Sequence, residues 1–530
     1  MRRCCWIGLA AAVALVVAAG CRAPGGRGAE ALWQPVWQPL IHRTPPEPVC
    51  PFTSRARPAG SVLTTEDDPV DLPRKRAWEE SHGGKDAARP FVRARLGGLP
   101  TGRVVDGRIL PRDDRAFLER LAADTWRGLV ALADRESGLP VDHVRLDDGP
   151  AGADVGDYTN ITNVGLRLLA IAAATDLGFA TEAAARAMAE RILATLDGLE
   201  TYRGLFFNYY DTTSLERSSN FLSFVDTAWL EAGLIATRTT FPELAARCTA
   251  LVDRMGFGLF YDRKRQAISH GYFVHRHAPS RYDYGVLYTE ARLGALLAIG
   301  KGDMPEDAWF AMIRTYPASC TGQTGTPVDV ERRTIRGHAV VNAHYAWEGT
   351  RFVPSWGGSM FEALMPALVL DEARLAPRSL GPNDALHAEV QRRYAIETLH
   401  YQVWGMSPSA IPDADGYREY GVPPLGMRGY MPGAVTPHAA ALALLVAPGP
   451  ATANLRALAE GFAVYSDWGY YDAVDPRTHA VARGYLALDQ SMLFLALADH
   501  LAPHGMRERF TSDPIVQRVL PLLAAERFFD

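Results

Sequence analysis

Acidic residues at the start of apolar helical segments are the chain's best candidates for chemistry. Glu290 lies in Leu287-Tyr-Thr-Glu-Ala-Arg-Leu293, and Asp489 lies in Leu486-Ala-Leu-Asp-Gln490. Burial opposes the charged form of a carboxyl group, so an acid in such a setting can stay protonated and act as a general acid. Two plainer interpretations stay open: Glu290 is only a neighbour of Arg292, and Asp489 only caps its helix.

A third acid, Glu362, lies in the stretch Ser355-Trp-Gly-Gly-Ser-Met-Phe-Glu-Ala-Leu-Met-Pro366. Trp356 offers a flat apolar face, and the two glycines let the backbone come close to a ligand. Ser359 and Glu362 also match the S-x-x-E pattern of a capping box at a helix start. Glu362 is therefore either a site residue or a capping residue, and the pattern does not choose between them.

Several loops combine aromatic rings with acids, as in Asn208-Tyr-Tyr-Asp211, Tyr417-Arg-Glu-Tyr420 and Trp468-Gly-Tyr-Tyr-Asp472. Rings stack on the apolar faces of a sugar and polar groups bind its hydroxyls, so this mixture favours a neutral carbohydrate ligand. Cleavage of a glycosidic bond needs two carboxyl groups, one on each side of the bond. The predicted substrate-binding residues are Asp211, Asp226, Arg292, Trp356, Trp404, Tyr417, Glu419, Tyr420, His438 and Asp472, with Asp226 either a hydroxyl acceptor or a structural partner.

Other classes of function lack their sequence signals. The net charge is −5 and no long basic run occurs, which argues against nucleic acid as a partner. No P-loop and no G-x-G-x-x-G after a strand is present. His270, His275 and His277 lie close together but show neither helical i, i+4 pairing nor an obvious acid ligand. We therefore expect no metal and no cofactor.

The elements that would position these residues are mostly helical. At 530 residues and 48% hydrophobic composition, the chain can bury a large core. Helical periodicity begins at Asp113, and no β-alternating run has comparable strength. Alternate connections are long and carry the aromatic residues, which predicts a mainly α fold, an (α/α)6 barrel of six hairpins with aromatic-rich loops on one face. Besides the first helix, the predicted helices are 162–175, 181–197, 223–238, 242–255, 284–300, 304–314, 358–373, 383–402, 436–446, 451–464 and 486–501.

The N-terminal residues predict export. Arg2 and Arg3 precede an apolar run over residues 7–19 that is too short to span a bilayer and suits a signal peptide. Val17-Ala-Ala-Gly-Cys21 resembles a bacterial lipoprotein box, so Cys21 would carry a lipid anchor, although a cleaved signal with an incidental cysteine stays open. We expect a location in the bacterial cell envelope, periplasmic or at the cell surface. The predicted parts are a lipoprotein signal peptide (1–21), a tether and irregular extension (22–112), a catalytic domain (113–505) and a tail (506–530).

Eight short motifs in order give the chain a family resemblance. Over about residues 113 to 502 it resembles the glucoamylase-like domain of bacterial β-1,2-glucanases of glycoside hydrolase family 144. The transglycosylating middle domain of cyclic β-1,2-glucan synthases is similar, though more distant. The motifs are Asp157-Tyr-Thr-Asn160, Asn208-Tyr-Tyr-Asp211, Thr289-Glu-Ala-Arg-Leu293, Lys301-Gly-Asp303, the Ser355–Pro366 stretch, Tyr417-Arg-Glu-Tyr-Gly421, Thr436-Pro-His438 and Leu488-Asp-Gln490.

The resemblance implies an α/α six-hairpin barrel that cleaves β-1,2-glucan without a metal. It places the acid at Glu290 and the base at Asp489 in an inverting, endo-acting reaction. The related transglycosylases retain configuration and use a glutamate at the position of Glu362 as nucleophile. Since this chain has that glutamate too, glucosyl transfer stays an alternative, although the Ser-Trp-Gly-Gly form and Leu488-Asp-Gln490 look closer to the hydrolases. A non-catalytic glucan-binding lipoprotein is the third possibility.

Overall fold

The computed structural model describes residues 70–146, 153–503 and 505–530. The predicted signal peptide, Cys21 and most of the tether lie outside these ranges. Within them, no helix combines the length and the apolar character that crossing a membrane requires.

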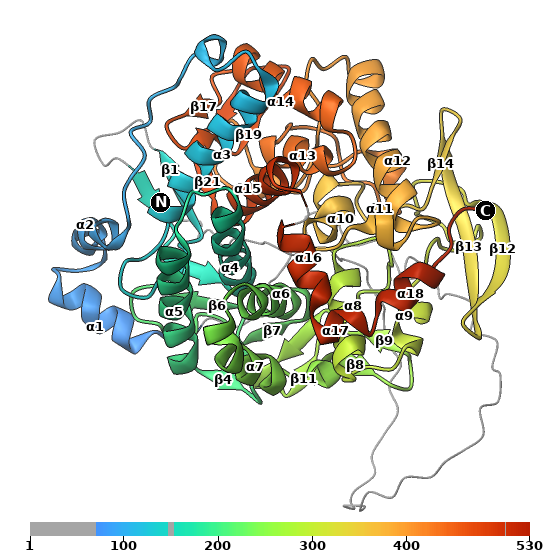
Figure 1. The fold of residues 1–530 in the computed structure, drawn as a ribbon, viewed down its shortest axis with the longest axis horizontal. Coiled ribbons are helices and arrows are strands. Elements are labelled where there is room, and N and C mark those ends of the chain that lie inside the picture. Colours follow the sequence, from blue (N-terminus) through green and yellow to red (C-terminus); the bar gives the residue numbers. More distant parts are fainter. Residues whose placement is uncertain (1–69, 147–152, 504) are drawn as a thin grey trace, which may run out of the picture.

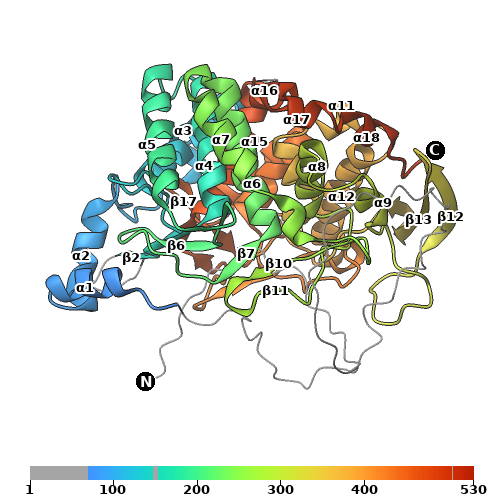
Figure 2. The same ribbon diagram turned by 90° about the horizontal axis from the view of Figure 1, so that it is seen from below.

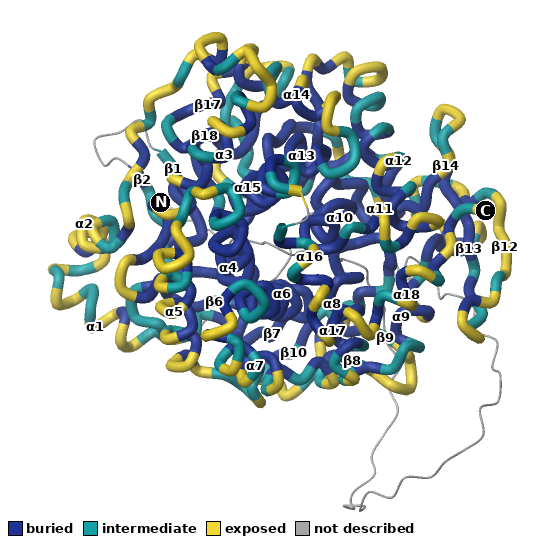
Figure 3. The backbone as a smooth tube through the Cα atoms, in the orientation of Figure 1, coloured by how far each residue is buried: buried dark blue, intermediate teal, exposed yellow. Residues whose placement is uncertain are grey.

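Six of the described helices are buried along nearly their whole length and form the centre of the molecule (Figure 3). Their sequences are rich in Ala, Leu and Gly with no polar stripe, which is typical of helices covered on all sides. These inner helices are α4 (Ile161–Asp176), α6 (Phe224–Thr240), α8 (Ala291–Lys301), α10 (Met360–Leu364), α13 (Pro437–Leu442) and α15 (Ala487–Leu501).

The inner helices follow one another around a common centre (Figure 1). Helix α4 packs on α6 and α15, α6 packs on α8, and α13 packs on α10 and α15. Arg292 of α8 connects the remaining pair, because its guanidinium donates hydrogen bonds to the carbonyls of Glu362 and Ala363 in α10. Each inner helix therefore contacts the next one.

A second set of helices lies outside the first, one before each inner helix in the sequence. The sequence prediction of a mainly α fold is confirmed. Predicted helix 358–373 is broken, because Pro366 follows α10 and begins a short 3₁₀ turn, η5 (Pro366–Leu368). The outer set is α3 (Asp114–Ala131), α5 (Glu182–Gly198), α7 (Ala245–Arg254), α9 (Asp307–Ala311), α12 (Leu380–Arg393) and α14 (Pro448–Gly461), with α11 (Glu372–Leu375) beside α12.

Short antiparallel strands occupy many of the connections. Figure 2 shows β2, β6, β7, β10 and β11 on one side of the molecule, with α16 and α17 on the opposite side. The three-stranded sheets are β2 (Ala153–Val155), β1 (His143–Leu146), β21 (Gly484–Leu486); β11 (Ala278–Pro279), β10 (Gly271–Phe273), β7 (Phe221–Ser223); and β12 (Val328–Ile335), β13 (His338–Trp347), β14 (Thr350–Phe352). The paired strands are β3 (Tyr158–Asn160) with β6 (Tyr209–Asp211), β4 (Thr201–Tyr202) with β5 (Leu205–Phe206), β8 (Tyr261–Asp262) with β9 (Ala267–Ile268), β15 (Ser409–Ala410) with β16 (Tyr417–Arg418), β17 (Tyr465–Ser466) with β18 (Gly469–Tyr470), and β19 (Ala473–Val474) with β20 (Val481–Ala482).

The hairpin of β12 and β13 was not predicted from the sequence. Strand β12 is mostly exposed and carries charged residues on both faces, so it lacks the alternation of apolar and polar residues on which a strand prediction depends. Only pairing with β13, whose central residues are buried, defines it as a strand.

Both ends of the described chain are more ordered than the sequence suggested. Within the extension that we expected to be irregular, α1 (Pro73–Ser81) and α2 (Lys85–Arg95) are helical. The expected tail contains α16 (Gly505–Ser512), α17 (Pro514–Gln517) and α18 (Leu520–Ala525). It is fixed to the body by a buried ion pair between Arg314 and Glu526, with nitrogen and oxygen 2.6 Å apart.

Candidate active site

Every inner helix carries a polar side chain in its first turn or at its N-cap. Helix N-termini have backbone N–H groups without intrahelical partners and a partial positive charge, so they favour carboxylates and other acceptors. All six side chains are at most 4% exposed. They are Thr162 (α4), Asp226 (α6), Glu290 (α8), Glu362 (α10), His438 (α13) and Asp489 (α15).

Glu290 has the properties of a general acid. It is 1% exposed, and neither of its side-chain oxygens has a hydrogen-bond partner among the described residues. Burial first, and the Glu362 carboxylate second, raise the pKa of Glu290 to about 8. The group is therefore mainly protonated at pH 7 and can give a proton to a ligand.

Glu362 is held by several donors. Its Oε2 accepts hydrogen bonds from Ser355 Oγ at 2.8 Å and from the Gly357 and Ser359 amides at 2.9 and 3.2 Å. The Ser359 hydroxyl accepts from the Glu362 amide, so the capping box is present. Burial raises the pKa of Glu362, and these hydrogen bonds oppose the rise. Glu362 fixes the Ser355–Ser359 loop.

Asp489 belongs to a second buried group with Asp472 and His438. His438 Nδ1 is 3.5 Å from Asp489 Oδ2, and Asp472 Oδ2 accepts a hydrogen bond of 2.7 Å from the Ala410 amide. Burial, followed by the Asp472 carboxylate, raises the pKa of Asp489 well above its usual value. Burial also raises the pKa of Asp472, to about 6, and lowers that of His438 to about 3, so the imidazole is neutral.

This second group is also the candidate cation site among the residues that the structure describes, since its ligand atoms lie within 4.8 Å of one another. It supplies three side chains, and one Asp472 oxygen is already bonded to the Ala410 amide. Structural metal sites usually provide four protein ligands. The arrangement does not by itself require a metal.

Two tyrosines lie within the electrostatic influence of both sets of acids, Glu290 with Glu362 and Asp489 with Asp472. Burial and the charges of Glu362, Glu419 and Glu290 raise the pKa of Tyr430 well above 10. Burial and the charges of Asp489, Asp472 and Glu419 do the same for the pKa of Tyr417. Glu419 is only partly buried, and burial with Glu362 nearby raises its pKa to about 7. The acids of the two groups therefore form one electrostatically connected site.

Two predicted substrate-binding residues are engaged elsewhere. Arg292 is 0% exposed and its guanidinium donates to both oxygens of Glu372, at 2.8 and 2.6 Å. The Asp211 carboxylate is paired with Lys75 of α1 at 3.0 Å and accepts from the Thr213 and Ser214 amides. Both side chains hold the structure together and are not placed to contact a sugar.

The aromatic residues singled out from the sequence are largely covered in the structure. Trp356, Trp404 and Tyr420 are 8%, 3% and 5% exposed. Tyr158 and Tyr209 are less buried and pack edge to face, with ring centroids 5.9 Å apart. They come from paired strands β3 and β6, within two motifs of the family resemblance.

The sequence interpretation missed Asp142 and His143. Asp142 Oδ2 lies 3.0 Å from His143 Nδ1, and the Asp142 carboxylate contributes to the raised pKa of Asp489. His143 is the first residue of β1 and Asp142 directly precedes it, and β1 pairs with β21, the strand leading into α15. Only that pairing brings them near Asp489, so no local sequence signal could have identified them.

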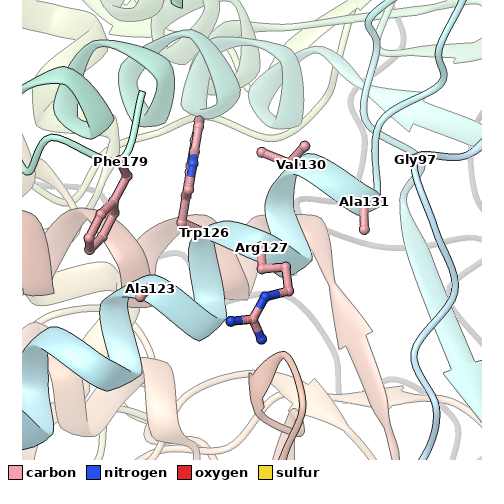
Figure 4. Close-up of a pocket in the computed structure, with 7 residues that line it drawn as sticks. All are labelled: Gly97, Ala123, Trp126, Arg127, Val130, Ala131 and Phe179. Atoms are coloured by element: carbon pink, nitrogen blue, oxygen red, sulfur yellow. The ribbon is translucent and has the colours of Figure 1, made fainter. Parts of the chain in front are cut away.

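A cavity of about 450 Å³ lies away from this site (Figure 4). It is lined mainly by one face of α3, including Trp126, Arg127 and Val130, and by Phe179. None of the candidate site residues lines it. No converging acids accompany its apolar lining, so it does not compete with the carboxylate cluster as an active site.

The fold and part of the sequence match known proteins. Residues 327–513 match the family model Glycoamylase, described as "Putative glucoamylase". The cyclic beta-(1,2)-glucan synthase NdvB of Rhizobium meliloti (strain 1021) is 30% identical over 310 residues, which are 54% of this chain and 10% of that protein. The chain thus spans about a tenth of the length of its curated relative.

Two solved structures share the fold. The endo-beta-1,2-glucanase of Chitinophaga pinensis, solved with sophorotriose and glucose, has a TM-score of 0.61 and 16% identity, covering 78% of this chain and 99% of that one. The beta-1,2-glucanase of Parabacteroides distasonis has a TM-score of 0.63 and 17% identity, covering 78% and 61%. The resemblance predicted from the sequence, to β-1,2-glucanases and to cyclic β-1,2-glucan synthase, is confirmed.

Proposed function

We propose that the chain is a glycoside hydrolase that cleaves β-1,2-glucan, with Glu290 as general acid and Asp489 as general base. One observation carries the proposal: all four side-chain oxygens of these buried acids lack hydrogen-bond partners among the described residues. Buried polar atoms normally have partners, because leaving them without any costs about 1 to 3 kcal/mol each. A bound substrate and an attacking water would supply those partners.

The inner helices, in this proposal, are the inner ring of an (α/α)6 barrel. Each outer helix precedes an inner helix in the chain, and the inner helices contact one another in a closed order. In that order α8 and α15 stand opposite each other, with α4 and α6 between them on one side and α10 and α13 on the other. Glu290 and Asp489 would then face a substrate from two sides.

The reaction follows from these positions. Glu290 transfers its proton to the glycosidic oxygen as the bond from that oxygen to the anomeric carbon breaks. A water oxygen bonds to the anomeric carbon from the opposite side, and Asp489 accepts the proton of that water. Glu290 ends ionised and Asp489 protonated, and proton exchange with solvent restores both. Glu362 orients the loop beside Glu290 and does not react.

The choice of β-1,2-glucan as substrate is supported by the relatives. Structures of this fold include endo-beta-1,2-glucanases, one of them bound to sophorotriose and glucose. Tyr417 and Glu419 are partly exposed groups close to the buried acids, and the partly exposed Tyr158 packs edge to face on His143 and on Tyr209. They would contact glucose units through ring faces and hydroxyl acceptors.

A second candidate is transfer of a β-1,2-linked glucosyl chain to a sugar acceptor. The similarity to cyclic beta-(1,2)-glucan synthase favours it, since at 30% that identity exceeds the 16–17% to the two glucanases. Such a reaction needs Glu362 as nucleophile. Its hydrogen bonds from Ser355, Gly357 and Ser359 reduce its nucleophilicity, which favours the hydrolase.

The proposal includes export and anchoring through a lipid on Cys21. Its support is the sequence alone: the basic start, the short apolar run and Gly20-Cys21. The enzyme would meet β-1,2-glucan in the cell envelope.

Release of reducing ends from linear β-1,2-glucan tests the assignment. The unmodified chain should release them, and Glu290→Gln and Asp489→Asn should each lower kcat by at least about 100-fold with KM little changed, because each removes proton transfer and preserves shape. Glu362→Gln should be milder. If Glu362→Gln is inactive while Asp489→Asn stays active, the transfer reaction replaces the hydrolase assignment. If the unmodified chain releases no reducing ends, a non-catalytic glucan-binding protein remains.

A further inference from the structure

Helix α1 is fixed to the loop that follows β6. The side chain of its N-cap residue, Leu72, accepts no hydrogen bond from the first turn. The Glu216 carboxylate does so instead, because it accepts from the Arg74 and Lys75 amides at 2.9 and 2.8 Å. Figure 2 shows α1 on the side of the molecule that carries β2 and β6. A carboxylate from a distant loop therefore stabilises the positive end of this helix.

Lys75 extends this contact to the paired strands β3 and β6. The residue is 8% exposed, and its ammonium group is paired with Asp157 and with Asp211, whose Oδ2 lies 3.0 Å from Nζ. Asp157 directly precedes β3, and Asp211 is the last residue of β6 and the pairing partner of Tyr158. Two largely buried carboxylates at one place repel each other unless a cation lies between them. Lys75 therefore holds this end of the two strands together.

Strand β3 is connected in turn to the segment of the proposed base. The Asp142 amide donates a hydrogen bond of 2.7 Å to the carbonyl of Tyr158, the first residue of β3. The Asp142 carbonyl accepts a hydrogen bond of 2.8 Å from the Ala487 amide. Ala487 is the first residue of α15, and Asp489 lies in the same first turn. Backbone hydrogen bonds therefore join the start of β3 to the start of the helix that carries the base.

Side chains follow the same route. The Tyr158 ring packs edge to face on His143, with centroids 6.1 Å apart, and His143 Nδ1 lies 3.0 Å from Asp142 Oδ2. Burial and Asp472 raise the pKa of Asp489 most, and the Asp142 carboxylate adds to the rise. A displacement of β3 would therefore change both the backbone support and the charge around Asp489.

We propose that Lys75 is a positioning residue for glucan cleavage and that α1 acts as a clamp on the segment of Asp489. This inference rests on the proposed function, since it takes Asp489 as the base. Lys75 acts only through other residues: it fixes Asp157 beside β3, and β3 fixes Asp142. Asp142 then fixes the first turn of α15. Residues 73–81, which the sequence placed in an irregular extension, serve catalysis in this way.

Lys75→Met tests the clamp, because it removes the charge and keeps an unbranched side chain of similar length. We expect kcat on linear β-1,2-glucan to fall about 10- to 100-fold with KM within about twofold, since a small displacement of a reacting group lowers the rate and leaves substrate binding intact. Lys75→Arg can still pair with both carboxylates and should keep kcat within about fivefold of the unmodified chain. All rates are measured well below the melting temperature of each variant, so that unfolding does not contribute.

Arg76→Met is the matched control. It removes a cation from the same helix, but Arg76 is exposed and is paired with Asp71 at 2.6 Å, away from β3. This variant should change neither kcat nor KM.

Hydrogen exchange tests the clamp without activity. The Asp142 and Ala487 amides are the donors of the connection. In Lys75→Met both should exchange at least about tenfold faster than in the unmodified chain, because the elements that hold them open more often, and Arg76→Met should not change them. Faster exchange in a chain that cleaves no β-1,2-glucan would refute the proposed function and leave the clamp in place.

Three results would overturn the proposal. Unchanged kcat in Lys75→Met would show that α1 does not act on the base. Equal losses in Lys75→Arg and Lys75→Met would show that the paired charge is not what positions Asp157. Faster exchange confined to residues 73–81 and 211–216, with the Asp142 and Ala487 amides unaffected, would show that the influence of Lys75 ends at β6.

Discussion

The site divides its acids by how well they are hydrogen-bonded. Glu362 receives bonds from the Ser355 hydroxyl and the Gly357 and Ser359 amides, whereas Glu290, on the neighbouring helix, receives none from the described residues. A carboxyl group without donors favours its neutral form when buried, and one with several donors favours its charge. The same residue type thus gives a proton donor and a fixed anion in neighbouring positions.

Glu290 gives a prediction about stability as a function of pH. Its pKa in the folded chain is about 8, above the usual 4.5, so the folded state binds this proton more tightly than the unfolded state. Its contribution to stability is fully present below pH 4.5 and is lost as pH rises through 8. Glu290→Gln cannot ionise and should be more stable than the unmodified chain, by on the order of 3 kcal/mol near pH 7.

Urea unfolding at pH 4.5 and pH 8 measures this effect. The stabilisation by Glu290→Gln should be small at the lower pH and larger at the higher one. If Glu290→Gln and the unmodified chain differ in unfolding free energy by the same amount at pH 4.5 and pH 8, Glu290 is not a buried neutral acid. The general-acid assignment would then lose its physical basis.

At the scale of elements, the repeated device is a loop that ends at the N-terminus of a buried helix. The apolar periodicity of α6, α8 and α15 and the acids at their starts were visible in the sequence, so Asp226, Glu290 and Asp489 could be identified locally. Their neighbours could not: Asp142 reaches Asp489 only through the pairing of β1 with β21. Burial of Arg292 was also invisible, because its partner Glu372 is 80 residues away.

The Gly357–Gly358 loop gives a prediction at this scale. Gly358 has a φ of +79°, and a Cβ there would come within 2.2 Å of the Val422 carbonyl oxygen. Gly302 has a similar φ of +86° at the end of α8, but a Cβ there meets nothing within 4 Å. Gly302→Ala should therefore cost about 1 kcal/mol of unfolding free energy, the backbone cost alone, and Gly358→Ala clearly more.

Thermal unfolding and activity of the two variants check this. Gly358→Ala should also lower kcat, since the loop that it distorts carries the donors to Glu362, whereas Gly302→Ala should leave kcat unchanged. Similar melting temperatures for the two variants would mean that the loop yields easily and does not fix Glu362.

At the scale of the whole molecule, the described chain begins with two helices that the sequence did not predict, α1 and α2. The matched glucanase of Chitinophaga pinensis is covered almost completely, at 99%, by 78% of this chain. Helix α1 of the extension packs against the body, where Lys75 pairs with Asp157 and Asp211. The helical structure of α1 is supported by carboxylates that are distant in sequence. The Pro- and Arg-rich sequence of the segment therefore did not predict a helix.

The predicted lipid anchor is tested by fractionation. Cys21→Ala removes the only residue of the box that could be acylated, so the variant should move from the membrane fraction to the soluble fraction. Cys248, a free and buried cysteine of the body, provides the control, and Cys248→Ala should leave the distribution unchanged. An unmodified chain that is already soluble would refute the anchor.

The order of the inner helices also predicts the stereochemistry of cleavage. Glu290 on α8 and Asp489 on α15 belong to helices that are not neighbours in the closed order, whereas Glu290 and Glu362 belong to neighbouring helices joined by Arg292. Inversion requires carboxyl groups roughly 6.5 to 9.5 Å apart, with room for a water, and retention requires roughly 5 to 5.5 Å. Opposite helices fit inversion, and adjacent ones fit retention. Cleavage of a β-linked glucan by the Glu290–Asp489 pair should therefore release the new reducing end as the α anomer, which proton NMR detects before mutarotation. Initial release of the β anomer would assign the reaction to Glu290 and Glu362, and the chain would then act by the double displacement of the transglycosylases.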